Sequence, residues 1–398
     1  MNSIKQKITA WYENRKNTRP AIFSGKGGYA LILVLMVTTL LQSLSANFIV
    51  ETQTSVGYIK KYDNRFKASC IASSGVEIAK GILEADKMGM GQLLTGKSSD
   101  TNCDSYEDIW ALDFPPFPFE NGTIKIEISD ENSKINVNAF ANELTEQTRY
   151  YYMAQTFFMN MGLLIDFADI IHDWIDIDDS RLPYGAESGD YYMTLTPPYR
   201  AKNASFDSID ELLMLKGMSP EIYYGLGGGN FGIEKNLVTH NKGDVSMDMA
   251  RLSKILGGEN PDAVKKRENT NIKIGKEKDR ALANYFRVYG DNKDFLHDYN
   301  RININTASYR VISALTENMT DDKVTEIIKR RNIKPFSTID EIKDIVQNDS
   351  EFEILKKYIT VRSYIFKIKV TAAVNSAETK IVAYYSRDNK KLLYWCEE

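Results

Sequence analysis

Acidic side chains gather in one stretch of this chain, where a helical pattern gives way to a turn-rich loop. They are Asp169, Asp173, Asp176, Asp178, Asp179, Glu187 and Asp190, with Gly185 and Gly189 among them. Carboxylates are hard ligands, and calcium takes about six to eight oxygens from such loops, whereas zinc prefers His or Cys. The pattern favours a calcium site, with Asp173, Asp176, Asp178, Asp179, Glu187 and Asp190 as candidate ligands. A solvated acidic loop with helix-capping aspartates is the alternative.

Paired carboxylates can also catalyse acid-base chemistry, but nothing beyond their number indicates an active site. The chain has 3 histidines, His172, His240 and His297, and none accompanies a nucleophile motif. The glycine-rich run at 225–232 lacks the Lys-Ser/Thr ending of a phosphate-binding loop, so we interpret it as a linker. We therefore expect no enzyme.

The composition is that of a folded body. A net charge of -4 and 26% charged residues show none of the basic excess of a dedicated nucleic-acid binder. The 3 cysteines, Cys70, Cys103 and Cys396, are too few for a disulfide framework. A Cys70–Cys103 bridge is one interpretation, and three ordinary buried thiols are the other.

The N-terminal region predicts a membrane anchor. No charged residue lies between Lys26 and Glu51, and residues 29–50 are mostly apolar, which matches the roughly 20 residues needed to cross a bilayer. Residues 1–28 are basic, which predicts a single-pass protein with a cytoplasmic N-terminus. Helical spacing continues to about Leu83, so the second half of this helix should pack on a globular domain.

The start of this helix resembles the signal of type IV pilins and pseudopilins, in which Gly27-Gly28 precede Tyr29-Ala30-Leu31-Ile32-Leu33. The resemblance implies cleavage after Gly28 by a prepilin peptidase on the cytoplasmic side and methylation of Tyr29. Most family members have Glu at the fifth mature position, where this chain has Leu33.

The remaining pattern predicts an α+β fold. Residues 122–138 alternate like two short antiparallel strands joined by a hairpin, and residues 364–395 contain three more strands. The material between them is largely helical. We expect a leader (1–28), a transmembrane helix (29–50), a pilin-like domain in two parts (51–138 and 359–398), and a helical domain inserted at 139–358, with a polar loop enlargement at 227–281.

The insertion closely resembles minor pseudopilin K of type II secretion. The shared strings are Asp173-Trp174-Ile175-Asp176-Ile177-Asp178, Pro183, Gly185-Ala186-Glu187, Tyr191-Tyr192, Lys216-Gly217-Met218 and Ile302-Asn303-Ile304-Asn305-Thr306-Ala307, with Lys134-Ile135-Asn136-Val137-Asn138 as an earlier counterpart. This family characteristically lacks the fifth-position Glu, which agrees with Leu33.

The resemblance implies that calcium binds near the acidic loop. It also implies that the chain is anchored in the inner membrane and takes a place at the tip of a periplasmic filament. Implied partners are minor pseudopilins I and J, the major pseudopilin, the prepilin peptidase, and secreted cargo or the secretin. A minor pilin of a type IV pilus or competence system remains the close alternative.

Two segments resemble helix-hairpin-helix or SAM-like modules, which raises a membrane-anchored DNA receptor as an alternative. The second module has Thr316 to Asp321 at its hairpin, without the glycines that contact phosphate. A basic run, Lys329, Arg330, Arg331 and Lys334, follows it, but such runs commonly face water. We expect no nucleic-acid partner.

Overall fold

The computed structural model describes residues 27–91, 100–140, 148–225, 281–290 and 300–398, together with residues 7, 9–11 and 13. The predicted enlargement at 227–281 lies outside the described residues except for Ala281, and so does most of the predicted leader. The chain divides into two compact units, Met1–Asn64 and Arg65–Glu398. Helix α2, Gly27–Lys87, contributes to both.

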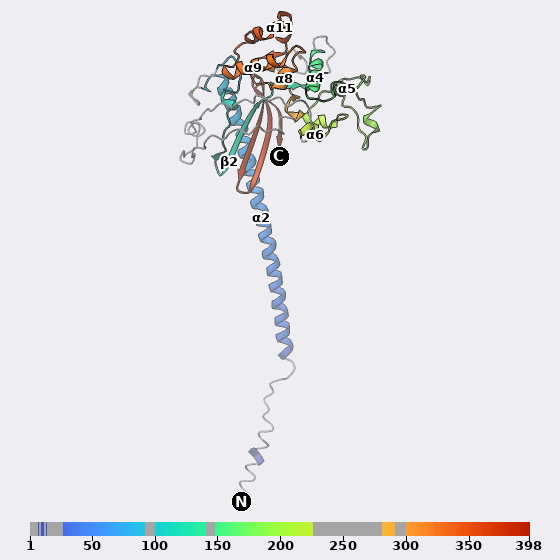
Figure 1. Cartoon of the computed structure of the whole chain (residues 1–398). Helices are drawn as coiled ribbons and strands as arrows, with labels where there is room; N and C mark the ends of the chain where they lie inside the picture. The colour runs from blue at the N-terminus through green and yellow to red at the C-terminus, as the bar shows by residue number, and fades with distance from the viewer. Residues whose placement is uncertain are drawn as a thin grey trace. The chain divides into compact units, whose positions relative to one another are not determined.

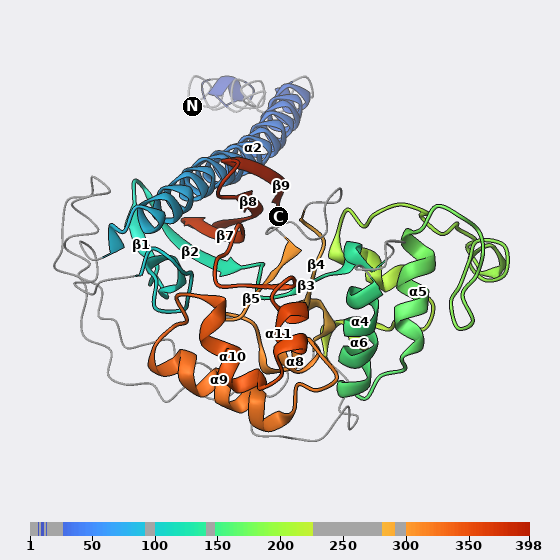
Figure 2. The ribbon, with the colours of Figure 1, turned by 90° about the horizontal axis from the view of Figure 1, so that it is seen from above.

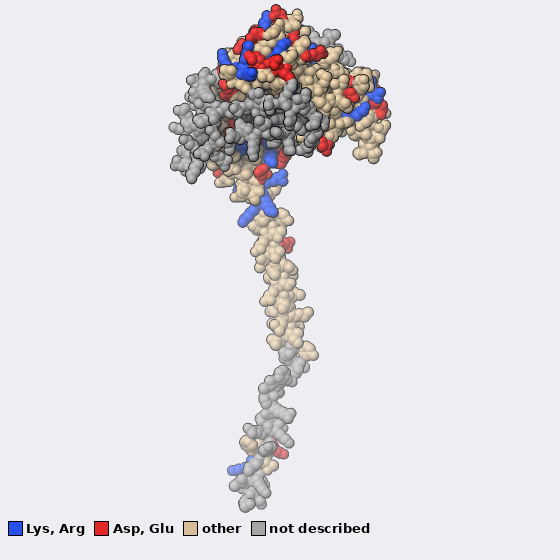
Figure 3. Space-filling view, in the orientation of Figure 1, with Lys and Arg blue, Asp and Glu red and all other residues tan. Residues whose placement is uncertain are grey.

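In the first unit, α2 is apolar and exposed. Every large apolar side chain described between Tyr29 and Val50 faces outward, and by length and composition this helix can cross a bilayer. Figure 3 shows this part of the helix almost free of charged surface. The predicted helix from Tyr29 to about Leu83 therefore agrees with the structure, which extends it by a few residues at each end.

In the second unit, the remainder of α2 packs on a five-stranded antiparallel sheet (Figures 1 and 2). The strand order is β1-β2-β7-β8-β9, with bounds Phe117–Phe119, Gly122–Asp130, Ile365–Val374, Ala377–Ser386 and Lys391–Glu397. The helix lies so close to the sheet that a Cβ at Gly75 would approach Ile124 and Val370 to 2.5 and 2.6 Å. Any other residue at this position would have to displace the side chains of Ile124 and Val370.

The predicted hairpin within residues 122–138 is wrong. Strand β2 pairs with β7, across the whole insertion, whereas β3, Ile135–Asn136, pairs in parallel with β4, Phe286–Arg287. The proline-rich turn also contains an edge strand, β1, paired with β2. The chain therefore leaves the sheet after Asp130 and returns at Ile365. The insertion is thus longer at both ends than the predicted range of 139–358.

Among the described residues, the insertion contains two similar modules. The first module comprises β3, η2 (Val137–Ala139), α4 (Thr148–Asn160), α5 (Asp166–Ile175), η3 (Tyr192–Thr194), η4 (Ile209–Met214), α6 (Pro220–Tyr224), η6 (Leu282–Asn284) and β4. The second module comprises β5 (Ile302–Asn303), α8 (Tyr309–Ser313), α9 (Asp321–Ile333), η8 (Ile339–Ile342), α10 (Lys343–Val346), α11 (Asp349–Leu355) and β6 (Ile359–Thr360). Each begins and ends with short strands that pair in parallel, and Figure 2 shows helices α4, α5 and α6 of the first module in green and helices α8 to α11 of the second in orange.

The same asparagine arrangement organises both modules. In the first, the Oδ1 of Asn138 accepts the backbone N–H of Phe206 at 2.7 Å, and its Nδ2 donates to the carbonyls of Phe206 and Val288 at 3.1 and 2.9 Å. In the second, Asn305 pairs with the backbone N–H and carbonyl of Phe336, both at 2.9 Å. The side-chain amide of each asparagine thus bonds to a phenylalanine backbone as a neighbouring strand would, since it satisfies one backbone donor and one acceptor.

After each of these phenylalanines comes a capped 3₁₀-helix. Ser208 and Glu211 form a capping box before η4, and Thr338 and Glu341 form the same box before η8. The sequences Phe206-Asp207-Ser208-Ile209-Asp210-Glu211 and Phe336-Ser337-Thr338-Ile339-Asp340-Glu341 are correspondingly alike. The two modules are therefore repeats of one local structure.

Candidate functional site

Helix α5 presents an acidic stripe to the loop that follows it. Its apolar side chains, Phe167, Ile170, Ile171 and Trp174, enter the core. Asp169, Asp173 and Asp176 are spaced by four and three residues, so they share another face. This face meets residues 182–187, where the loop folds back.

Two aspartates of this stripe hold the loop in place. Asp169 accepts the phenolic O–H of Tyr151 and the backbone N–H of Tyr184, the latter at 3.1 Å. Asp173 accepts the backbone N–H of Leu182 at 3.2 Å. A Cβ at Gly185 would overlap the Asp173 carboxylate, so glycine is required for this close approach. These contacts position the acidic groups before any ligand is considered.

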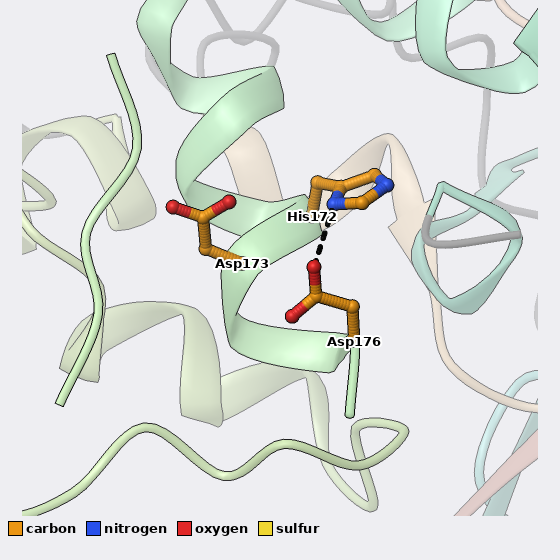
Figure 4. A group of neighbouring side chains, drawn as sticks. All are labelled: His172, Asp173 and Asp176. Carbon is orange, nitrogen blue, oxygen red and sulfur yellow. Dashed lines mark ion pairs between the residues drawn. The ribbon is translucent and has the colours of Figure 1, made fainter. Parts of the chain in front are cut away.

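Two of the six predicted ligands, Asp173 and Asp176, come together with His172 at the end of α5. One ligand atom from each of His172, Asp173 and Asp176 lies within 4.8 Å of the others, and His172 Nδ1 is 3.2 Å from Asp176 Oδ2 (Figure 4). Glu187 is 3% exposed, and its Oε1 has no hydrogen-bond partner. Its Oε2 accepts the backbone N–H of Ser188 at 3.3 Å.

The neighbouring aspartates act electrostatically on Glu187. Burial, followed by the charges of Asp173, Asp176 and Asp179, raises the pKa of Glu187 to about 7. Burial also raises the pKa of Asp173 to about 6, with a contribution from Asp176. Carboxylates that raise each other's pKa in this way would be relieved by a shared cation.

The other three predicted ligands have local partners. Asp178 accepts the backbone N–H of Ser180 at 2.7 Å, within its own turn. Asp190 accepts the backbone N–H of Glu187 and a guanidinium N–H of Arg181, both at 2.9 Å; these contacts outweigh burial and lower its pKa. Asp179 accepts the side-chain amide of Asn203 at 3.2 Å. Asp190 therefore orients Glu187, while Asp178 shapes the turn.

Sequence reasoning missed two residues here, His172 and Asn203. His172 was noted only as one of few histidines, although its spacing of four from Asp176 predicts contact on a helix. Asn203, at φ 46, donates to the carbonyl oxygens of Ile177 and Asp178 at 3.4 and 3.1 Å as well as to Asp179. An Asn can adopt this left-handed conformation. Nothing in the neighbouring sequence, however, indicates that its side chain will hydrogen-bond to residues 177–179.

The donor set suits a hard cation. Asp173, Asp176 and Glu187 supply carboxylate oxygens, and an orphaned buried oxygen at Glu187 is an atom that a bound ion would satisfy. The residues present therefore fit calcium: the geometry brings Asp173 and Asp176 together, and the unpartnered oxygen and raised pKa of Glu187 favour it as a third ligand.

The three cysteines are free thiols in this structure. Cys70 is exposed on α2, whereas Cys103 is buried. The structure contains no Cys70–Cys103 bridge, and of the three thiols only Cys103 is buried. Cleavage after Gly28 stays a prediction, since α2 simply begins at Gly27 and runs through the site without interruption.

The basic run considered for DNA is partly engaged elsewhere. Arg331 is buried and donates to the carbonyl of Ile304 at 2.5 Å. Arg330 forms ion pairs with Glu326 and Asp344, both at 2.8 Å. These contacts give no support to a phosphate-binding role for either arginine.

Comparison with known families identifies the two modules. Residues 133–227 match the first-domain model of type II secretion system protein K, and residues 302–362 match a second model of the same protein. These ranges correspond to the described parts of the first and second modules, apart from η6 and β4.

Several curated proteins are similar over the same part of the chain. Type II secretion system protein K of Pseudomonas aeruginosa is 26% identical over 198 residues, and that of Pectobacterium carotovorum is 28% identical over 211 residues. The matches cover 48% and 50% of this chain and span 58% and 61% of the relatives' own length. The chain thus matches about three fifths of each relative.

A solved structure shares the fold over a longer range. The chain resembles a chain of the GspK-GspI-GspJ complex from the enterotoxigenic Escherichia coli type 2 secretion system, with a TM-score of 0.54 and 15% sequence identity. The superposition covers 85% of this chain and 98% of that one. The predicted α+β, pilin-like fold with a helical insertion is confirmed by this likeness.

Proposed function

Because this chain belongs to the type II secretion system protein K family, we propose that it is a non-enzymatic minor pseudopilin, anchored in the inner membrane with its body in the periplasm. The observation that carries this proposal is helix α2. It is apolar and exposed from Tyr29 to Val50, yet from Ala68 onward it is built into the core of the sheet domain. Such a helix can leave a membrane and join a filament, since its two halves suit different surroundings.

The helical insertion favours a position at the filament tip. Residues 131–364 leave the sheet between two neighbouring strands, so the insertion adds a large body to an otherwise small pilin-like domain. A subunit stacked directly above would have to accommodate this body. Leu33 supports the same position, because a terminal subunit needs no buried carboxylate to meet a subunit above it.

By analogy with the solved complex, the proposed partners are minor pseudopilins I and J, with which this subunit would start assembly. The major pseudopilin, secreted cargo and the secretin would be met later. Gold labels on a tagged full-length subunit in isolated filaments test the position. We expect one label at one end, and labels along the shaft would exclude a tip role.

Processing at Gly28 is the second part of the proposal. The prepilin peptidase would cut after Gly28 and methylate Tyr29, which leaves the apolar part of α2 intact. Mass spectrometry of the protein from its native membrane should find methylated Tyr29 at the N-terminus. An intact Met1 would instead indicate an ordinary signal anchor.

Calcium binding is the third part. We expect calcium to bind Asp173, Asp176 and Glu187 and to fasten the acidic loop to α5. Calorimetric titration of the full chain in detergent should give binding that Glu187→Gln weakens at least about tenfold, since it removes one charged ligand. Asp178→Asn is the matched control, because among the described contacts the side chain of Asp178 bonds only within its own turn. Equal losses in the two variants would refute this ligand set.

A further inference from the structure

A second group of acidic residues lies in the pilin-like domain, away from the acidic loop. Asp86 is at the end of α2, and Asp104 and Asp108 precede η1 (Ile109–Ala111). They are 6%, 3% and 3% exposed, and one carboxylate oxygen from each lies within 4.8 Å of the others. Three carboxylates this close and this dry cannot all be charged unless enough positive charge faces them.

Among the residues that the structure describes, one cation, Arg387, contacts this group directly. The two terminal nitrogens of Arg387, just after β8, each donate to one oxygen of Asp104 at 2.7 Å, and Asp104 also accepts the backbone N–H of Ser363 at 2.7 Å. Arg387 is farther from Asp86, at 3.6 Å. Because its guanidinium is committed to Asp104, the pair Asp86 and Asp108 is left with an excess of negative charge.

The other titratable groups in the described part of the chain do not supply the missing positive charge. The ones that face the cluster from neighbouring elements are Cys103, Asp130, Tyr385, Asp388 and Glu84, which are neutral or acidic. The nearby lysines are taken, since Lys87 pairs with Asp388 at 2.6 Å and Lys390 with Glu84 at 3.2 Å. These ion pairs are partly exposed and add little to the buried potential.

The hydrogen bonds of Asp86 and Asp108 allow one of these carboxyl groups to hold a proton. Asp108 Oδ2 accepts the backbone N–H of Ser105 at 2.7 Å, whereas the buried Oδ1 of Asp86 has no hydrogen-bond donor. A proton held by one carboxyl can be donated to the other, which removes one negative charge and satisfies an orphaned oxygen together.

We propose that Asp86 and Asp108 share one proton, and that this proton clamps the end of α2 to the segment before η1 and to Arg387 at the end of β8. The clamp makes the pilin-like domain pH-sensitive: it holds when protonated and loosens when the pair becomes fully charged. The predicted acidic loop and the proposed filament role are not involved in this inference.

The direction of the pH effect follows from burial. Burial, and then the neighbouring carboxylates, raises the pKa of both Asp86 and Asp108. In the unfolded chain these groups have the usual pKa of about 4. Their contribution to the stability of the folded state is therefore greatest below that pH. It is lost as the pH rises through the higher pKa values of the folded state, that is, from mildly acidic to alkaline conditions.

Thermal unfolding of the full chain in detergent, with a chelator present, tests the clamp. Between about pH 5.5 and about pH 8.5 the wild type should lose Tm, and Asp108→Asn should roughly halve that loss, because its neutral amide can donate to Asp86 at any pH. Asp113→Asn, an exposed aspartate on the same segment, should keep the wild-type loss. An unchanged pH dependence in Asp108→Asn would overturn the proposal.

A spectroscopic measurement covers the case in which Asp108→Asn fails to fold. Wild-type protein with isotope-labelled aspartate should show the infrared band of a protonated carboxyl at about pH 7.5, where ordinary aspartates are ionised. Absence of this band would refute a shared proton. A Tm that rises with added calcium in Glu187→Gln but not in Glu187→Gln/Asp108→Asn would also refute it, because a metal ion would then hold the group.

Discussion

The two modules of the insertion use the same scaffold but close it differently. In the second, Lys334 and Pro335 suffice to connect the end of α9 to Phe336. In the first, residues 176–205 intervene between the end of α5 and Phe206, although Asn138 binds Phe206 just as Asn305 binds Phe336. The scaffold therefore does not need the acidic loop. Its carboxylates are an addition to the first module, and this favours a ligand-binding role over a structural one.

The largest effect should come from the shared part of the comparison. Asn138→Ala and Asn305→Ala each leave buried backbone groups of a phenylalanine unpaired, at about 1–3 kcal/mol for each group. We expect each variant to lose about 3 kcal/mol or more in urea unfolding. Asn332→Ala, on the exposed surface of α9, is the control and should change stability by less than about 0.5 kcal/mol. A large loss in only one module would show that the two scaffolds are not equivalent.

The next effect should separate the modules. Calcium at about 100 times its dissociation constant would stabilise the loop by about 2.7 kcal/mol. Hydrogen exchange should therefore slow at residues 182–188 of the first module on adding calcium, while residues 334–336 of the second exchange as before. Slowing in both modules, or in neither, would contradict the assignment of the ion to the acidic loop.

A smaller effect is expected at the loop's closest approach to α5. Gly185→Ala places a methyl group against Asp173 and should cost about 1–3 kcal/mol and weaken calcium binding. At Gly189 a Cβ meets nothing within 4 Å, so Gly189→Ala is the matched control. Chemical unfolding with and without calcium measures both the loss of stability and the loss of calcium binding. If the two variants behave alike, the close contact between Gly185 and Asp173 is not needed for either.

The smallest effect should again be common to both modules. Ser208→Ala and Thr338→Ala each remove a side-chain cap and should cost about 1 kcal/mol in unfolding experiments. Similar values would support the equivalence of the two 3₁₀-helices. If Ser208→Ala also altered calcium affinity, the cap and the acidic loop would be coupled.

Local patterns in the sequence predicted local structure well. Alternation marked β2, β7, β8 and β9, and helical spacing marked α2, because each signal lies within its own element. The partner of β2 could not be predicted in the same way. Its neighbour β7 follows the whole insertion, and a plausible turn at residues 129–133 imitated a hairpin.

The acidic loop shows the same limit at the level of side chains. Residue types predicted a cation site, but which carboxylates converge depends on the path of the loop, which Asp169 and Asp173 set through backbone N–H groups. The cluster of Asp86, Asp104 and Asp108 escaped notice for a related reason. Its counter-charge, Arg387, is nearly 300 residues away in sequence, since the interaction with Asp104 spans 283 positions.

The place where the chain leaves and re-enters the sheet has a consequence for how such a protein could arise. Asn132 Oδ1 accepts the backbone N–H groups of Tyr364 and Ile365 at 3.0 and 3.1 Å, and Asp130 accepts the hydroxyl of Ser363 at 2.6 Å. Both ends of the insertion are thus fastened to each other, next to strands that a short turn could join. Chain inserted at such a point adds only a slowly growing closure entropy, so modules could be gained or enlarged there while the pilin-like sheet keeps its register.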